Sequence, residues 1–429
     1  MNTHADHINW GNGAKDCGVG AATRDFVDLG NRYILGLSGT GIEFEIDRLD
    51  RKWGELTGEL TVRCALAGAR TIDAANTISV ARFAVSDLRA RQERAKYLIA
   101  RSKAPTIDWY GLLEEFCGRV LASERTGQAV VHLRDLARPG PDETFDVDGL
   151  RLLRRHPVMG FGDGGTLKSY LLTHILGTLA QRGLRVLYAD WEFSGEEHRD
   201  RLERLFGPQM PDVLYVRCDR PLVVEVDRLR RIVQDEHVDY MGYDSVTFAC
   251  PGRPEDAEVA AAYYRAVRSI GVGSLHIAHI NKSENGDQKP FGSAFWHNGS
   301  RATWFIKRGD EAPDERQVTI GLYNRKANTG PLRGAVGFEF TFDADRTYVR
   351  RADLTDVPNL AAGLPTWQRM QKALSHGPLT PAALAEELGA KVETIDRVAR
   401  GKGKGQDLFA KVPGPDGVTR IALVERRHA

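Results

Sequence analysis

A glycine-rich turn between an apolar strand and an apolar helix constrains this sequence more than any other feature. Residues 157–161 (PVMGF) predict a buried strand, and the turn that follows, residues 162–167, reads GDGGTL. Lys168 and Ser169 come next, and residues 170–179 (YLLTHILGTL) predict a helix. Glycines let backbone N–H groups curl around a phosphate, and a helix N-terminus adds the positive end of its dipole. This order of elements therefore predicts a phosphate-binding loop.

The loop predicts a site for ATP and Mg²⁺. In such loops the lysine, here Lys168, reaches the β- and γ-phosphates, and the next hydroxyl, that of Ser169, binds Mg²⁺. The predicted nucleotide-binding residues are Gly162, Asp163, Gly164, Gly165, Thr166, Leu167, Lys168, Ser169 and Tyr170. One position departs from the pattern GxxxxGK[ST], because Leu167 occupies the place of the last glycine. A glycine-rich turn without a ligand is therefore the alternative, and phosphate binding requires that Leu167 adopt a backbone conformation usually supplied by glycine.

A carboxylate follows the apolar strand expected at residues 240–243 (YMGY). Asp244 stands at this strand end, where it can hold the hydration shell of Mg²⁺ together with Ser169. An aspartate in this place is as often a helix N-cap or a turn residue. Ser169 and Asp244 are therefore the candidate metal ligands.

Two further strand ends supply candidate catalytic groups. The strand beginning at Val186 ends in two acids, of which Glu192 is the first candidate for deprotonating the attacking water and Asp190 the second. A later strand ends at His279, and either this histidine or Lys282 is placed to sense the γ-phosphate. The alternative for each group is an ordinary structural residue at the end of a strand.

The region that contains these motifs predicts an α/β fold. Short apolar strands alternate with helical stretches from about residue 143, which indicates a mostly parallel sheet covered by helices, and the last strands suggest an antiparallel extension. The expected strands are residues 157–161, 186–189, 240–243, 274–278, 302–306, 318–322 and 336–340.

Composition shifts and Pro/Gly punctuation divide the rest of the chain. Period-two alternation after residue 31 indicates a β-rich domain, and residues 86–103 predict a basic helix with Ser86 as N-cap and a charge of +4 between Asp87 and Lys103. The predicted parts are a loose arm (1–30), a β-rich α+β domain (31–106), a helical linker (107–142), the ATPase domain (143–352), a linker (353–365) and a small C-terminal domain (366–429).

The C-terminal domain predicts helices near residues 365–375, 380–389 and 391–400, followed by a hairpin. Two helices around a glycine-containing turn plus a hairpin resemble a winged helix-turn-helix domain, whose second helix enters the DNA major groove. Eleven Lys/Arg against seven Asp/Glu give this segment +4. The candidates for phosphate contacts are Arg397, Arg400, Lys402 and Lys404. A winged-helix protein-interaction module is the alternative.

Charge and cysteine usage exclude some classes of protein. The 429 residues carry 59 Lys+Arg and 58 Asp+Glu, so binding to DNA through bulk positive charge is excluded, although local basic segments are not. Five cysteines without a CxxC pair favour reduced thiols over a disulfide framework or a zinc site. Neither a secretion signal nor an apolar run near the ~18 residues that span a membrane is recognisable. We therefore expect a soluble cytoplasmic protein.

The polar strand ends resemble those of the RecA-like P-loop ATPase family, specifically its RepA-like hexameric helicase branch with phage and plasmid members. The resemblance covers about residues 143–350. The motifs that carry it are GDGGTLKS (162–169), YADWE (188–192), YDS (243–245), HIAHINK (276–282), FGSAF (291–295) and RKANTGP (325–331).

The resemblance implies a RecA-like core that hydrolyses ATP, with Lys168, Glu192 and His279 in catalytic roles. It also implies a homo-oligomeric ring or filament in which the basic turn Arg325–Lys326 reaches a neighbouring subunit's nucleotide, although Arg301 competes for that role. Loops after the sensor strand would face the pore and grip single-stranded DNA. Lys282 and Lys289 are the candidates for that contact.

The function implied is that of a nucleic-acid-stimulated ATPase motor, most simply a DNA-replication helicase of a phage, plasmid or other mobile element. Two alternatives remain open. The first is an ATP-switched DNA-binding adaptor or regulator that assembles on DNA without unwinding it. The second is a nucleotide-binding scaffold in which Leu167 has abolished turnover.

Overall fold

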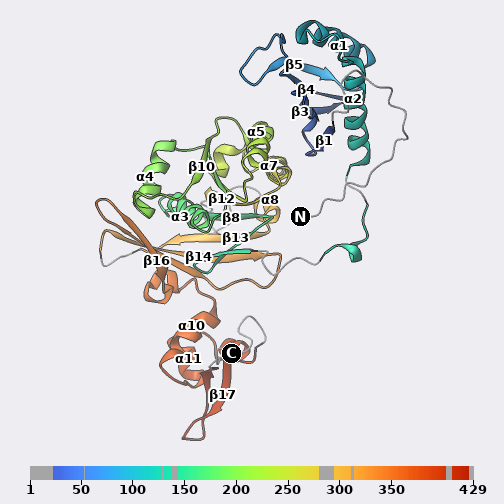
Figure 1. Cartoon of the computed structure of the whole chain (residues 1–429). Coiled ribbons are helices and arrows are strands. Elements are labelled where there is room, and N and C mark those ends of the chain that lie inside the picture. The colour runs from blue at the N-terminus through green and yellow to red at the C-terminus, as the bar shows by residue number, and fades with distance from the viewer. Residues whose placement is uncertain are drawn as a thin grey trace. The chain divides into compact units, whose positions relative to one another are not determined.

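The computed structural model describes residues 23–52, 54–127, 130–137, 144–279, 294–310, 314–401 and 408–424. The chain divides into two compact units, Met1–Arg138 and Pro139–Ala429. Figure 1 shows helices packed on a β-sheet in each unit.

The first unit is built on a five-stranded antiparallel sheet whose strands follow one another in chain order. Its strands are β1 (Arg24–Asp28), β2 (Tyr33–Leu37), β3 (Ile42–Lys52), β4 (Glu55–Cys64) and β5 (Thr77–Ala84). Two helices complete it, α1 (Leu88–Ser102) and α2 (Trp109–Thr126), and a short 3₁₀ helix η1 (Leu133–Asp135) follows. Alternate strand residues such as Phe44 are fully buried beneath the helices, as period-two patterning requires.

Three details of this unit differ from the sequence-based expectations. Strand β1 lies within the segment expected to be a loose arm, because Phe26 stacks on Tyr33 with ring centroids 6.1 Å apart; residues 1–22 lie outside the described residues. Helix α2 is not a linker, since Trp109 is buried in the core of the sheet domain. The N-cap of α1 is Asp87 rather than Ser86, and its carboxylate accepts from the N–H of Arg89.

The second unit is built on a nine-stranded mixed sheet in the order β10-β9-β11-β12-β8-β13-β14-β15-β16. Its strands are β8 (Pro157–Gly162), β9 (Val186–Asp190), β10 (Val213–Arg217), β11 (Tyr240–Asp244), β12 (Gly273–His279), β13 (Ala302–Arg308), β14 (Gln317–Ala327), β15 (Val336–Phe342) and β16 (Thr347–Ala352). Strands β10 to β13 in this spatial order are parallel, and β14 to β16 extend the sheet antiparallel. The predicted α/β core is therefore confirmed.

Helices cover both faces of this sheet (Figure 1). One face packs against α3 (Lys168–Gln181) and α4 (Gly195–Phe206), and the other against α5 (Leu222–Asp235) and α7 (Ala257–Ile270). The shorter helices are α6 (Val246–Ala249) and α8 (Ala294–Gly299). Both faces of the parallel strands are thus buried, which explains their nearly continuous apolar sequences.

The strand order brings the predicted motifs to one edge of the sheet. The connection through α3 carries the chain from β8 past two positions to β9, so that β12 later inserts between β8 and β11. In register, Asp190 pairs with Asp244, and His279 pairs with Gly162. The carboxyl ends of β8, β9, β11 and β12 therefore meet beside the start of α3, where ligands of open α/β sheets bind.

Several elements escaped sequence-based prediction. The hairpin β6 (Thr144–Val147) and β7 (Leu150–Leu153) forms a separate two-stranded sheet, and its apolar side chains pack against α3. Strands β10 and β16 lie at the two edges of the large sheet. Edge strands bury fewer side chains than central ones, so the apolar signal of these two was weak.

The C-terminal part of the second unit contains three short helices and a hairpin. Its elements are α10 (Thr366–Ala373), η3 (Leu374–His376), α11 (Pro381–Glu387), α12 (Val392–Ala399), β17 (Phe409–Pro413) and β18 (Thr419–Leu423), preceded by η2 (Leu354–Asp356) and α9 (Pro358–Ala361). Met370, Leu384, Ile395 and Ile421 form the fully buried centre of its core. Thr380 caps α11 by accepting from Ala383 N–H, as the sequence predicted.

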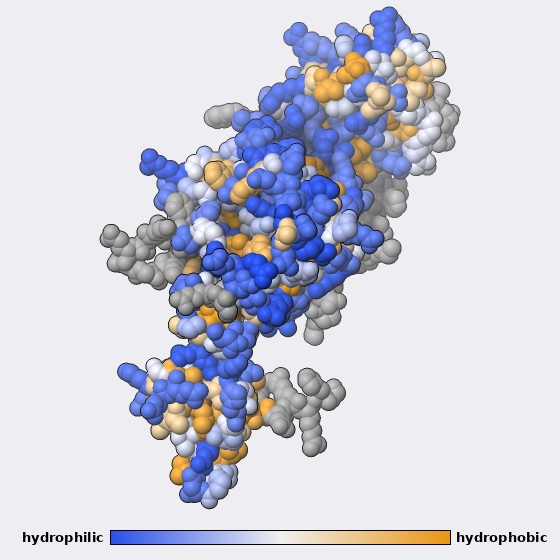
Figure 2. Space-filling model, turned by 90° about the vertical axis from the view of Figure 1, so that its left-hand side faces the viewer, coloured by the Kyte–Doolittle hydropathy of each residue, from blue (hydrophilic) through white to orange (hydrophobic). Residues whose placement is uncertain are grey.

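The face of the molecule drawn in Figure 2 is largely hydrophilic over the sheet-containing core, with apolar residues in separate small patches. Among the described residues, the structure contains no helix that combines the length and the apolar composition needed to cross a membrane.

Candidate nucleotide site

The phosphate loop leaves the carboxyl end of β8 and enters α3 without a gap. A Cβ at Gly162 would lie 2.4 Å from the carbonyl oxygen of Ile306, so only glycine permits this approach to β13. Gly165 has φ +73°, in the left-handed region that glycine adopts without strain. The hydroxyl of Thr166 closes the loop by donating to the Asp163 carbonyl at 2.8 Å. The loop is therefore shaped by local steric constraints.

Leu167 adopts the conformation that the missing glycine would supply. It is the N-cap of α3 with φ 56° and ψ 26°, in the left-handed region. Its side chain is half-buried against the apolar cluster beneath α3. This packing offsets part of the cost of about 1–2 kcal/mol that an L-residue pays for such a backbone. The departure from the motif thus leaves the loop conformation intact.

Lys168 folds back over the loop. Its ammonium group donates to the carbonyl oxygens of Gly162 at 3.2 Å and Asp163 at 2.6 Å, and lies 3.3 Å from the Thr166 hydroxyl. Burial lowers the pKa of Lys168, and the nearby carboxylates of Asp244 and Glu192 oppose that shift. A buried cation beside two carboxylates can bind phosphate oxygens that replace these carbonyls.

Asp244 is buried at the end of β11, close enough to Lys168 to affect its pKa. Its Oδ2 accepts a 2.7 Å hydrogen bond from Tyr188, whereas Oδ1 accepts none within the described residues. The neighbouring Ser245 hydroxyl is buried and unpartnered in that same part of the chain. An orphaned hydroxyl, a free carboxylate oxygen and Ser169 form a hard-oxygen donor set, which fits Mg²⁺ bound through a carboxylate, phosphates and water.

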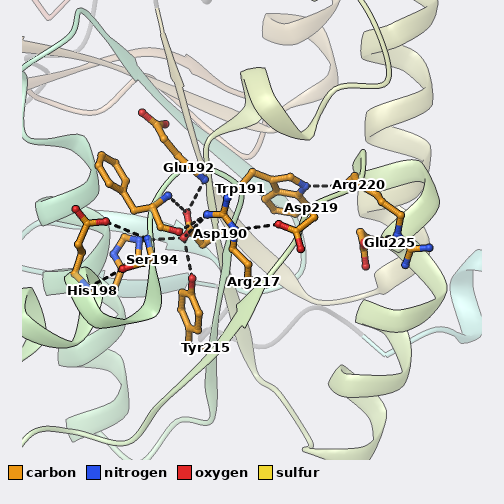
Figure 3. Close-up of polar contacts among 12 residues, drawn as sticks. Asp190, Trp191, Glu192, Ser194, His198, Tyr215, Arg217, Asp219, Arg220 and Glu225 are labelled. Atoms are coloured by element: carbon orange, nitrogen blue, oxygen red, sulfur yellow. Dashed lines mark hydrogen bonds and ion pairs between the residues drawn. The ribbon is translucent and has the colours of Figure 1, made fainter.

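Asp190 is the centre of a buried polar cluster rather than a free carboxylate (Figure 3). Its Oδ1 accepts from the N–H groups of Glu192 and Phe193 at 2.9 and 3.1 Å. Its Oδ2 accepts from the Tyr215 hydroxyl at 3.0 Å and from Arg217 at 3.3 Å.

Donors thus surround the Asp190 carboxylate. Burial alone would raise the pKa of Asp190, but contact with His198 and the backbone N–H groups outweighs it and holds the pKa below its ordinary value. A carboxylate so stabilised is a poor base, so Asp190 holds the turn that follows β9 in place.

Glu192 lies on the turn that Asp190 holds. Figure 3 shows its carboxylate directed away from the Asp190 cluster, and it makes no hydrogen bond or ion pair within the described residues. Its charge acts on Lys168 and on His279, so it lies near both. Trp191 fixes the same turn from the other side by donating its backbone N–H to the Asp244 carbonyl at 2.6 Å. Of the two acids, Glu192 is the one available for proton transfer.

His279 is half-buried at the end of β12 and pairs in register with Gly162. Burial, followed by the positive charge of Lys168, lowers the pKa of His279. Its ring is therefore neutral near pH 7 and can both donate and accept one hydrogen bond. The other candidate for this role, Lys282, lies outside the described residues, as do Lys289, Lys402 and Lys404.

Arg308 is a basic group at the loop that sequence reasoning missed. It ends β13, and its guanidinium donates to the Gly165 carbonyl at 3.3 Å. Asn359 in α9 donates to the Arg308 carbonyl at 3.1 Å, which ties the end of β13 to the following linker. The signal was available, because the strand sequence WFIKR ends in polar residues like the other strands.

The three candidates for a trans-acting basic group lie at the opposite edge of the sheet. Lys326 pairs with Thr303 near the start of β13, and Arg301 immediately precedes that strand. The Lys326 ammonium donates to three carbonyls at the end of α8, those of His297, Asn298 and Ser300, at 2.8–2.9 Å. All three of its donors are thus engaged in capping a helix.

Arg325 is exposed and not engaged in this way. Its guanidinium lies over the rings of Phe305 and Tyr323, 5.5 and 5.9 Å from their centroids, and makes no hydrogen bond or ion pair within the described residues. Arg301 is also exposed, and its backbone N–H donates to the Pro157 carbonyl at 3.0 Å. Arg325 is therefore the candidate whose charged end is held by aromatic rings and remains accessible.

Two other predicted contacts occupy defined places. The Tyr170 ring packs edge-on against Phe342 with centroids 5.4 Å apart, beneath the guanidinium of Arg201, so only its backbone belongs to the loop region. Arg397 and Arg400 are exposed at the end of α12, and Arg400 lies 3.9 Å from Asp396.

Comparisons with known proteins give similarity of fold only. No protein-family model matches the chain, and no curated protein matches it. Among solved structures, one ATPase domain is 12% identical, with 44% of this chain and 82% of that chain covered and a TM-score of 0.35. A KaiC-like protein from Pyrococcus horikoshii OT3 is 12% identical, with 46% and 91% covered and a TM-score of 0.37. Similarity at this level leaves the geometry of the site as the ground for any functional conclusion.

Proposed function

We propose that this protein is a P-loop ATPase that acts as a motor on nucleic acid. One observation carries the proposal: the glycine-rich loop and the start of α3 bring Lys168 into electrostatic contact with Asp244 at the end of β11 and with Glu192. Phosphate cradle, metal-ligand carboxylate and free carboxylate therefore share one edge of the sheet. This is the set of groups that phosphoryl transfer to water requires.

Each group has a distinct role in the proposed reaction. Lys168 binds the β- and γ-phosphate oxygens, and Ser169 and Asp244 would hold Mg²⁺, which neutralises developing phosphate charge when bound. Glu192 accepts the proton of the attacking water. His279, neutral and half-buried beside Gly162, donates a hydrogen bond to the γ-phosphate.

The proposed trans-acting group is Arg325. Its place near the amino end of β13, away from the phosphate loop of its own subunit, supports action on a neighbour's nucleotide. Such an arrangement implies a homo-oligomeric ring or filament, because each site is complete only at a subunit interface. The engagement of all three Lys326 donors favours Arg325 over that lysine.

The nucleic acid is proposed to be DNA. The exposed Arg397 and Arg400 lie at the end of α12, the helix in the position of a recognition helix, and suit contacts to DNA phosphates. A helicase of a mobile replication system is the specific form that we propose.

A DNA-stimulated ATPase assay tests this function. Wild-type protein should hydrolyse ATP faster with single-stranded DNA and displace a strand from a forked duplex, whereas Lys168→Ala should do neither. Equal ATPase rates for wild type and Lys168→Ala would refute the ATPase proposal. Robust DNA-stimulated hydrolysis without displacement on any fork would instead support the ATP-switched adaptor, which the exposed basic end of α12 also suits.

A further inference from the structure

A buried tyrosine contacts the carboxylate that would bind magnesium. The Tyr188 hydroxyl donates to Asp244 Oδ2 at 2.7 Å, and the side chains of both residues are almost fully buried. Tyr188 belongs to β9 and Asp244 to the adjacent β11, where Tyr188 pairs with Gly242 and Asp190 with Asp244. Paired residues on parallel strands share a face of the sheet, so the tyrosine reaches diagonally across to the carboxylate.

The packing around Tyr188 leaves its ring one position. The ring packs against His198 with centroids 4.2 Å apart. At Gly242 a Cβ would lie 2.8 Å from the side chains of Leu172 and Leu176 in α3, so the helix closes tightly over this part of the sheet. Burial, and then the negative charge of Asp244, raises the pKa of Tyr188 well above its ordinary value. The hydroxyl therefore remains a proton donor at every pH at which the protein is folded.

We propose that Tyr188 is a positioning residue for magnesium: it fixes Asp244 Oδ2, so that Oδ1 alone is presented to the hydration shell of the ion. Oδ1 accepts no hydrogen bond within the described residues, and the buried, unpartnered hydroxyl of Ser245 follows it in the chain. Hydrogen bonds from outer groups orient metal-binding carboxylates and tune their affinity for the ion. The inference rests on the proposed nucleotide site.

The chain offers a matched control one strand away. The Tyr215 hydroxyl donates to Asp190 Oδ2 at 3.0 Å, so this tyrosine also holds a buried carboxylate at a strand end. Asp190, however, contacts the backbone of the Glu192 turn rather than the metal position. Tyr215→Phe therefore removes the same type of hydrogen bond without touching the proposed metal ligand.

Equilibrium binding of a fluorescent, non-hydrolysable ATP analogue to the full-length protein, titrated with Mg²⁺, measures the effect without turnover. Tyr188→Phe should raise the Mg²⁺ concentration for half-maximal binding by about 10-fold, because loss of an outer partner usually weakens metal affinity about 10- to 100-fold. Tyr215→Phe should leave it within about twofold of wild type. With EDTA present, all three proteins should bind the analogue equally.

Several results would overturn the inference. One is an unchanged Mg²⁺ requirement in Tyr188→Phe, and another is an equal loss of analogue binding with EDTA, which would indicate a structural role. In an Asp244→Asn background Tyr188→Phe should have no further effect on the Mg²⁺ requirement; an additional effect there would also overturn it, and this comparison applies even if the single variant folds poorly. Absence of Mg²⁺-dependent binding by the wild type would refute the nucleotide site itself.

Discussion

Substitution of Leu167 by glycine and by alanine isolates the energetic cost of its left-handed backbone. An L-residue at φ 56° and ψ 26° pays about 1–2 kcal/mol, because its Cβ approaches the following carbonyl oxygen. Glycine avoids that cost but loses about 0.5–1 kcal/mol more backbone entropy on folding than alanine does. Both variants lose the packing of the leucine side chain. Leu167→Gly should therefore be about 0.5–1 kcal/mol more stable than Leu167→Ala.

Thermal unfolding of the full-length protein measures this difference. For a domain of this size about 1 kcal/mol corresponds to about 2–4 °C, so Leu167→Gly should melt about 1–4 °C above Leu167→Ala. Ala261→Gly in α7 is the control, because alanine there has ordinary helical geometry and glycine should lower stability by about 1 kcal/mol. The two glycine-for-alanine comparisons should thus have opposite signs. A Leu167→Gly variant that melts below Leu167→Ala would refute the reasoning.

Three further predictions concern the other site residues. Lys326→Ala should reduce stability by about 1–3 kcal/mol in a thermal melt, because three carbonyls lose their donor, whereas Arg325→Ala should leave melting nearly unchanged and abolish hydrolysis in the assembled protein; the reverse pattern would contradict the assignment. The pKa of Asp190 is lowered on folding, so its stabilising effect is present above 3.8 and is lost as the pH falls through the lower folded value; the melting advantage of wild type over Asp190→Asn should shrink over that range, and a constant difference would disprove the linkage. Arg308→Ala should weaken equilibrium binding of ATP several-fold, and an unchanged Kd would exclude a direct contact.

Local sequence determined the elements of the core and most of their order. Apolar runs of about four to eight residues bounded by glycine or polar residues predicted β8 and β11, because a parallel strand buried on both faces must be apolar throughout. The phosphate loop was predictable for the same kind of reason, since backbone geometry at Gly162 and Gly165 depends on the residue and its immediate neighbours. The cap of α11 at Thr380 is equally local.

Only the tertiary structure decided what each polar residue does. Asp190 and Glu192 are neighbours in one motif, yet donors from β10 surround the first and leave the second free. Arg325 and Lys326 are adjacent, and the carbonyls at the end of α8 engage only the lysine. A hydrogen-bonding partner far away in the chain leaves no trace in local periodicity.

Tyr188 and Leu167 show the same division between sequence and structure. In sequence Tyr188 reads as one more core residue of a buried strand, and only the pairing of β9 with β11 brings its hydroxyl to Asp244. Leu167 reads as a defect in a motif, and only the fold gives its backbone the left-handed conformation and its side chain an apolar site to pack in. The sequence by itself thus determined where chemistry-bearing residues cluster, because strand ends and turns are local properties. Which of them remain free to react was decided by packing between segments that are distant along the chain.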